Sequence, residues 1–158
     1  KLIPRTWILD PAPLPPQAVY PGLDIQNWEE LGGFSQKARE LVIKISGFDA
    51  RAWGARGVSL GSDLSREDWE KAIQSALREF PEHPNILQVF RHPMTTPQAY
   101  YQPDGQIVTM KGRVRLSPYF FVTGGEALLG GVLATVCPAD KKILHGMSDA
   151  VMLPVMAY

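Results

Sequence analysis

The sequence has a single cysteine and no net charge, which argues against a disulfide-bonded protein and against a nucleic-acid-binding protein. Cys137 is the only cysteine among 158 residues, so no internal disulfide can form, which is typical of a reducing compartment. Lysine and arginine together number 16, as do aspartate and glutamate, so the formal net charge is zero. Proteins that grip nucleic-acid phosphates usually carry a basic excess, and we therefore expect no nucleic-acid partner.

Long apolar runs and common nucleotide-binding motifs are also missing. No stretch approaches the ~18 apolar residues that span a bilayer, and the opening residues, KLIPRTW, do not read as a signal peptide. We therefore expect a cytoplasmic protein without a membrane partner. The chain starts without methionine, so we expect the rest of a longer parent chain. It contains neither a Walker phosphate loop nor a Rossmann fingerprint.

The first half of the chain predicts strands, a glycine-rich loop and one clear helix. Residues 41–46, LVIKIS, are short and β-branched, which favours a buried strand. Residues 48–61 follow as a loop with three glycines, and residues 58–60 within it are predicted to form a second strand. A helix is predicted after the N-cap residue Ser65 because apolar residues recur at helical spacing. These residues are Trp69, Ala72, Ile73, Ala76, Leu77 and Phe80.

Shorter segments complete the first half, and the second half reads mostly as strands. We predict a short strand over residues 7–9, a proline-rich surface loop over 10–22, a short helix over 35–41 and a buried strand over 86–90. Pro103-Asp-Gly105 is predicted to turn between strands over 98–102 and 106–110. Further strands are predicted over 112–122 and 128–136, the latter bulged at Gly130-Gly131.

Lys44 and the glycines that follow it form the first candidate site. A lysine inside an apolar strand is costly unless its charge is compensated. Its ammonium can reach phosphate oxygens, and backbone N–H groups of a glycine loop can approach the same oxygens. Arg51 and Arg56 add positive charge to that loop. The alternative for Lys44 is a sheet-edge lysine that extends into water.

Three further groups can carry chemistry, and each has a structural alternative. The segment Gln88-Val89-Phe90 suits an adenine held by backbone N–H and C=O groups, or it is an ordinary strand end. Arg113 and Arg115 alternate on one strand, so both face the same side and can bind phosphate or carboxylate, unless they line a solvated face. Asp149, near His145, can ligate Mg²⁺ or belong to a turn.

In their order along the chain, these elements resemble the ATP-grasp family. The resemblance rests on Ile3-Pro-Arg-Thr-Trp-Ile-Leu, the Lys44 strand, the glycine loop, the helix containing Trp69, Ile86-Leu-Gln-Val-Phe and the arginine-bearing strand. It implies an α+β fold of two small α/β lobes with mainly antiparallel sheets, over residues 1–90 and 91–158, without the family's N-terminal domain. It also implies an ATP-dependent carboxylate–amine or carboxylate–thiol ligase that acts through an acylphosphate.

The resemblance also assigns roles to individual residues. Lys44, Gly54 and Gly57 would bind the phosphates, and Gln88, Val89 and Phe90 would hold adenine. Arg115 or Arg113 would stabilise the transferring phosphoryl group, and Asp149 would bind Mg²⁺. The implied ligands are ATP, Mg²⁺ and a small carboxylate substrate.

Two departures from the family pattern support a second hypothesis. Family members typically place a glutamate where this chain has Gln88, and they carry a closely spaced acidic pair for Mg²⁺ that this sequence lacks. A non-catalytic nucleotide- or partner-binding domain derived from the same fold is therefore the alternative function. A third hypothesis, a strand surface that stacks single-stranded nucleic acid, rests on Lys111, Arg113, Arg115, Tyr119 and Phe120. The zero net charge opposes it.

Overall fold

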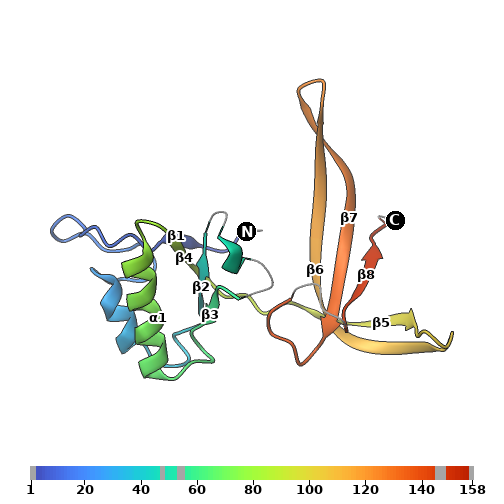
Figure 1. The fold of residues 1–158 in the computed structure, drawn as a ribbon, viewed down its shortest axis with the longest axis horizontal. Coiled ribbons are helices and arrows are strands. Elements are labelled where there is room, and N and C mark those ends of the chain that lie inside the picture. The colour runs from blue at the N-terminus through green and yellow to red at the C-terminus, as the bar shows by residue number, and fades with distance from the viewer. Residues whose placement is uncertain (1–2, 47–48, 53–55, 145–148, 157–158) are drawn as a thin grey trace. The chain divides into compact units, whose positions relative to one another are not determined.

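The computed structural model divides the chain into two compact units, Lys1–Arg91 (unit 1) and His92–Tyr158 (unit 2). It describes residues 3–46, 49–52, 56–144 and 149–156. Each unit contains one four-stranded antiparallel sheet, so the protein is α+β with mainly antiparallel sheets and few helices, as predicted (Figure 1). Within the described residues, no helix has the length and apolar character needed to cross a bilayer.

Unit 1 contains a sheet of strand order β1-β4-β2-β3. Its strands are β1 (Thr6–Ile8), β2 (Leu41–Ile45), β3 (Val58–Leu60) and β4 (Asn85–Val89). Two 3-10 helices, η1 (Trp28–Gly33) and η2 (Ala50–Ala52), and the α-helix α1 (Arg66–Glu79) complete the unit. The strand predicted over 58–60 is confirmed, and the strands predicted near 41–46 and 86–90 are confirmed to within one residue.

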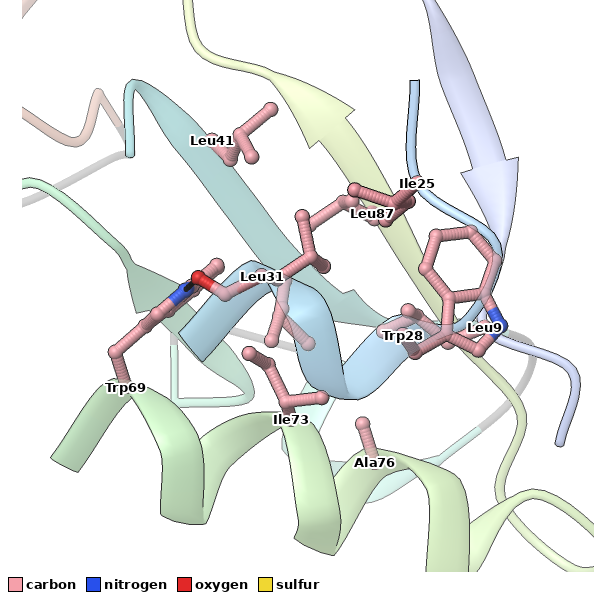
Figure 2. Packing of buried hydrophobic residues seen from close by; sticks show 10 residues of the cluster. Leu9, Ile25, Trp28, Leu31, Leu41, Trp69, Ile73, Ala76 and Leu87 are labelled. Carbon is pink, nitrogen blue, oxygen red and sulfur yellow. Dashed lines mark hydrogen bonds between the residues drawn. The ribbon is translucent and has the colours of Figure 1, made fainter. Parts of the chain in front are cut away.

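The predicted helix after Ser65 is confirmed, and its apolar stripe forms the core of unit 1. Ser65 caps α1, because its Oγ accepts a hydrogen bond from the Asp68 N–H at 3.0 Å. Figure 2 shows α1 and η1 on the same face of the sheet, with their apolar side chains between them and the strands. The buried cluster comprises Leu9, Ile25, Trp28, Leu31, Leu41, Ile43, Trp69, Ile73, Ala76 and Leu87.

The short helix predicted over residues 35–41 is wrong. Ser35 does accept hydrogen bonds from the N–H groups of Ala38 and Arg39, but these close a turn and no helix follows. Leu41 instead begins β2, because its side chain packs into the core between sheet and helix. The sequence analysis also did not predict the two 3-10 helices, of which η1 begins with a reciprocal capping box between Asn27 and Glu30.

Unit 2 is an antiparallel meander of order β5-β6-β7-β8. Its strands are β5 (Thr95–Tyr101), β6 (Ile107–Thr123), β7 (Glu126–Pro138) and β8 (Val151–Pro154). The strands predicted over 106–110 and 112–122 are one continuous strand of 17 residues. The predicted bulge at Gly130-Gly131 is confirmed, because Tyr119 pairs with Gly131 and Phe120 with Leu129, which leaves Gly130 without a paired residue.

Candidate functional site: a lysine on the sheet face of unit 1 opposite the core

Lys44 lies on the sheet face opposite the core. Strand alternation sends Leu41 and Ile43 of β2 toward α1, so Lys44 projects from the other face. Cross-strand register places two polar residues on that same face, because Val42 pairs with Gln88, and Gln88 pairs with Thr6. Three adjacent strands, β2, β4 and β1, thus carry Lys44, Gln88 and Thr6 on one face of the sheet.

Directed hydrogen bonds join these three side chains. The Lys44 ammonium donates to Gln88 Oε1 at 2.8 Å, and Gln88 Nε2 donates to Thr6 Oγ1 at 2.8 Å. The Thr6 hydroxyl donates in turn to the Pro4 carbonyl oxygen at 3.1 Å. This chain fixes the orientation of the Gln88 amide and holds the ammonium over β4. The structure therefore brings together two residues that the sequence analysis assigned to different parts of a nucleotide site.

The Lys44 cation is partly desolvated and has a neutral partner. Burial lowers the pKa of Lys44, and no opposing effect of a carboxylate accompanies that shift. Among the residues that the structure describes, none with a carboxylate forms an ion pair with this ammonium. A cation in that state is stabilised when an anion approaches, because the anion replaces the lost solvation.

The segment between β2 and β3 contains the predicted phosphate loop. Its Gly57 donates an N–H to the Arg51 carbonyl oxygen at 2.8 Å, and its own carbonyl accepts from Ile45 N at 3.1 Å. A Cβ at Gly57 would lie 2.6 Å from Ile45 Cγ2, so this position requires glycine for close approach. Gly54 lies outside the described residues, and the loop's contact with phosphate stays a prediction.

Arg51 is held by carboxylates, which leaves it poorly suited to bind phosphate. Its guanidinium lies 3.1 Å from Asp49 and 3.0 Å from Glu79, and His83 Nδ1 lies 2.8 Å from the same Asp49 carboxylate. The hydrogen bonds that Arg51 donates to Asp49 and, to a lesser extent, to Glu79 raise the pKa of Arg51 well above its ordinary value. Arg56 donates to the Ala50 carbonyl oxygen at 3.2 Å. The guanidinium groups of Arg51 and Arg56 therefore stabilise the conformation of the loop itself.

The proposed adenine segment uses two of its N–H groups within unit 1. Val89 N donates to the Arg5 carbonyl oxygen at 3.0 Å, and Phe90 N donates to the Glu40 carbonyl oxygen at 2.9 Å. An adenine held along this segment therefore needs an N–H donor beyond Phe90. The roles of Gln88, Val89 and Phe90 in adenine binding stay predictions, although the Gln88 side chain already contacts Lys44.

In unit 2, Arg113 and Arg115 share one face of β6 and contact the segment that follows β7. Arg113 Nε donates to the Ala139 carbonyl oxygen at 2.7 Å, and Arg115 Nη1 donates to the Leu144 carbonyl oxygen at 3.0 Å. Each guanidinium keeps further N–H donors, since arginine carries five. The proposed catalytic role of these arginines stays a prediction.

Asp149 also lies in unit 2, and its proposed metal ligation stays a prediction. The Lys141 ammonium lies 3.9 Å from its carboxylate. Among the residues with described positions, no group of three histidine, cysteine, aspartate or glutamate side chains is arranged to hold a metal ion. His145 lies outside that part of the chain. Asp149 alone does not make a Mg²⁺ site, since Mg²⁺ prefers several oxygen ligands in octahedral geometry.

The residue that sequence reasoning missed is Thr6. It was noted only as part of the opening segment, because nothing in the sequence states that β1 pairs with β4. Comparison with known proteins adds no assignment: no protein-family model, no curated protein and no solved structure matches the chain.

Proposed function

We propose that this chain is the nucleotide-binding portion of an ATP-dependent carboxylate–amine or carboxylate–thiol ligase of the ATP-grasp type. The observation that carries the proposal is Lys44, a half-buried cation on a central strand whose partner is a neutral amide. An ATP phosphate would supply the missing negative charge. The order of elements in unit 1, with the Lys44 strand, the Gly57 loop, α1 and β4, agrees with the resemblance described above.

The proposed reaction has two steps. A carboxylate oxygen of the substrate attacks the γ-phosphorus of ATP, the bond from that phosphorus to the β–γ bridging oxygen breaks, and ADP leaves. An amine or thiol then attacks the acylphosphate carbonyl carbon and releases phosphate. The protein acts by positioning and charge stabilisation, with Lys44 on the phosphates. The described residues do not form a Mg²⁺ site by themselves.

The second candidate is a domain that binds nucleotide or a partner without turnover. It is favoured by one observation, the lack of a three-residue acidic or histidine group in the described ranges. The two candidates share the Lys44 site and differ in chemistry. An ADP-release assay with mixtures of carboxylic acids and amines separates them, because only the ligase releases ADP in a way that depends on both substrates.

Nucleotide binding itself is tested by calorimetric titration of ATP, with and without MgCl₂. We expect Lys44→Met to weaken ATP binding about 10- to 150-fold, which corresponds to the loss of a hydrogen bond to a charged group. Lys37→Met is the matched control, since Lys37 is an exposed lysine in the turn before β2. Equal ATP affinity in wild type and Lys44→Met would remove Lys44 from the site and the proposal with it.

A further inference from the structure

Strands β6 and β7 extend beyond their neighbours as a two-stranded arm, defined here as residues 116–131 (Figure 1). On the outer edge of β6, pairing with β5 ends at Arg113, and the Met94 carbonyl accepts from Val114 N. On the outer edge of β7, pairing with β8 starts at Leu133. Along the arm, each strand therefore pairs only with the other, and both outer edges present N–H and C=O groups with no neighbouring strand among the described residues.

The arm is apolar on both of its faces. Seven large apolar side chains in it are each at least half exposed: Leu116, Tyr119, Phe120, Phe121, Val122, Leu128 and Leu129. Phe120 pairs with Leu129 on one face, and Phe121 pairs with Leu128 on the other. Between residues 116 and 139, Glu126 is the only aspartate, glutamate, lysine, arginine or histidine. Soluble monomers rarely expose such a surface, and an isolated two-stranded hairpin is marginally stable in water.

The exposed apolar area of the arm, counted over both of its faces, is comparable to what one partner buries in a symmetric dimer. At about 100 Å² for each half-exposed large side chain, the seven residues present on the order of 700 Å² per copy, divided between the two faces. A standard protein interface buries about 800 Å² on each partner. Two arms related by a two-fold axis present the same apolar surface to each other, as an isologous contact requires. Their free edges add backbone hydrogen-bonding groups that a second arm can pair.

The charge of the arm disfavours a lipid surface as the occupant. Its single charged residue is Glu126, at the turn made by Gly124 and Gly125, so a carboxylate would enter the bilayer first. Residues 116–131 contain no lysine or arginine to contact anionic lipid headgroups. Two arms that meet along their sides keep Glu126 at the end of the contact, where water can reach it.

We propose that the arm is a dimerisation element and that its partner is the arm of a second copy of this chain. The inference rests on unit 2 and does not depend on the nucleotide site of unit 1. The apolar side chains of the arm then fill the interface, and the hairpin is stabilised by association.

Sedimentation velocity on the full chain, across about 1 to 100 µM, tests this proposal. We expect a dimer whose dissociation constant rises about 30-fold or more in Phe121→Asp, as for a central interface residue. Ile107→Asp is the matched control, because Ile107 is 63% exposed against 61% for Phe121 and lies on the same strand outside the arm. Circular dichroism of each variant checks that the fold persists.

Three results would overturn the proposal. The first is a monomer across the whole concentration range, and the second is a dimer that Phe121→Asp and Ile107→Asp weaken equally. The third is a monomer that floats with vesicles of phosphatidylcholine and phosphatidylglycerol, which would assign the arm to a bilayer. A cysteine variant gives a second test of the dimer. Because Cys137 is buried, Val122→Cys introduces the one exposed thiol. Oxidation of this variant should link two arms covalently.

Discussion

The two units differ in the exposure of their apolar side chains, which are mostly buried in unit 1 and mostly exposed in unit 2. Among the residues that the structure describes, 16 apolar residues are buried, of which 13 belong to unit 1 and 3 to unit 2. The large exposed apolar residues in the same part of the chain show the reverse distribution, with only Ile3, Ile8 and Val19 in unit 1. The cause is architectural: α1 and η1 cover one face of the unit 1 sheet, whereas no helix among the described residues covers the sheet of unit 2.

This difference shows that the two units obtain stability from different sources. Unit 1 buries its apolar residues within its own chain, and its half-buried Lys44 is the cation for which we propose a ligand. Unit 2 leaves the apolar side chains of the arm exposed, and we propose that association covers them. We therefore expect substitutions in unit 1 to change the free energy of unfolding, and substitutions in the arm of unit 2 to change assembly.

The largest expected effect comes from equal truncations in the two units. Leu31→Ala should lower the free energy of unfolding by about 2–5 kcal/mol, because a fully buried leucine leaves a cavity. Leu129→Ala removes the same atoms from a side chain that is 57% exposed. It should change the free energy of unfolding by about 0.5 kcal/mol or less in dilute, monomeric protein. Urea unfolding followed by far-UV circular dichroism measures both. Similar losses from the two substitutions would contradict the comparison.

Two glycines extend the comparison to the backbone. Gly57→Ala should cost about 1–3 kcal/mol of overpacking, since the new Cβ meets Ile45 and the Arg51 carbonyl oxygen. Gly131→Ala in the arm should change stability by about 0.5 kcal/mol or less, because nothing lies within 4 Å of its added Cβ. Thermal unfolding of both variants, again in dilute protein, gives the measurement. A stable Gly57→Ala protein would show that this loop is loosely packed.

A smaller, pH-dependent effect is expected at Glu79 in unit 1. Hydrogen bonds from Arg51 and then Ser75 lower the pKa of Glu79 below its ordinary value of 4.5. A carboxylate with a lowered native pKa stabilises the fold above the unfolded pKa, and this contribution disappears as pH falls through the native value. Glu79→Gln should therefore cost under about 1 kcal/mol at pH 7, after solvent screening. Urea unfolding at pH 7 and pH 3 should show that cost shrinking in acid.

The sequence predicted much of unit 1 because its local signals agreed with its tertiary packing. The stripe from Trp69 to Phe80 required a covered face, and Ser65 marked where the helix begins. Ser35 gave a similar capping signal, but no helix follows it, because burial of Leu41 in the core places that residue on the central strand β2. In unit 2 the turn sequence Pro103-Asp-Gly105 and the apolar runs predicted strands, but not that a long part of β6 and β7 would have no neighbouring strands among the described residues.

Two of the three hydrogen-bonded residues of the candidate site could be singled out in the sequence, but their arrangement could not be predicted from it. Lys44 stood out as a charge inside an apolar strand, and Gln88 as a polar residue in another. Their 2.8 Å contact depends on the register between β2 and β4, which the sequence does not state. The contribution of Thr6 depends in the same way on the pairing of β1 with β4.

The ionisation of Lys44 in the free and the ATP-saturated protein tests the central claim most directly. Titration of its side chain by NMR, with ¹³C- and ¹⁵N-labelled lysine and Lys44→Met to assign the signal, gives both pKa values. We predict a pKa below the ordinary 10.5 in the free protein, caused by burial, and a higher pKa with ATP bound, because phosphate favours the charged ammonium. A Lys44 pKa that does not change at saturating ATP would contradict the account.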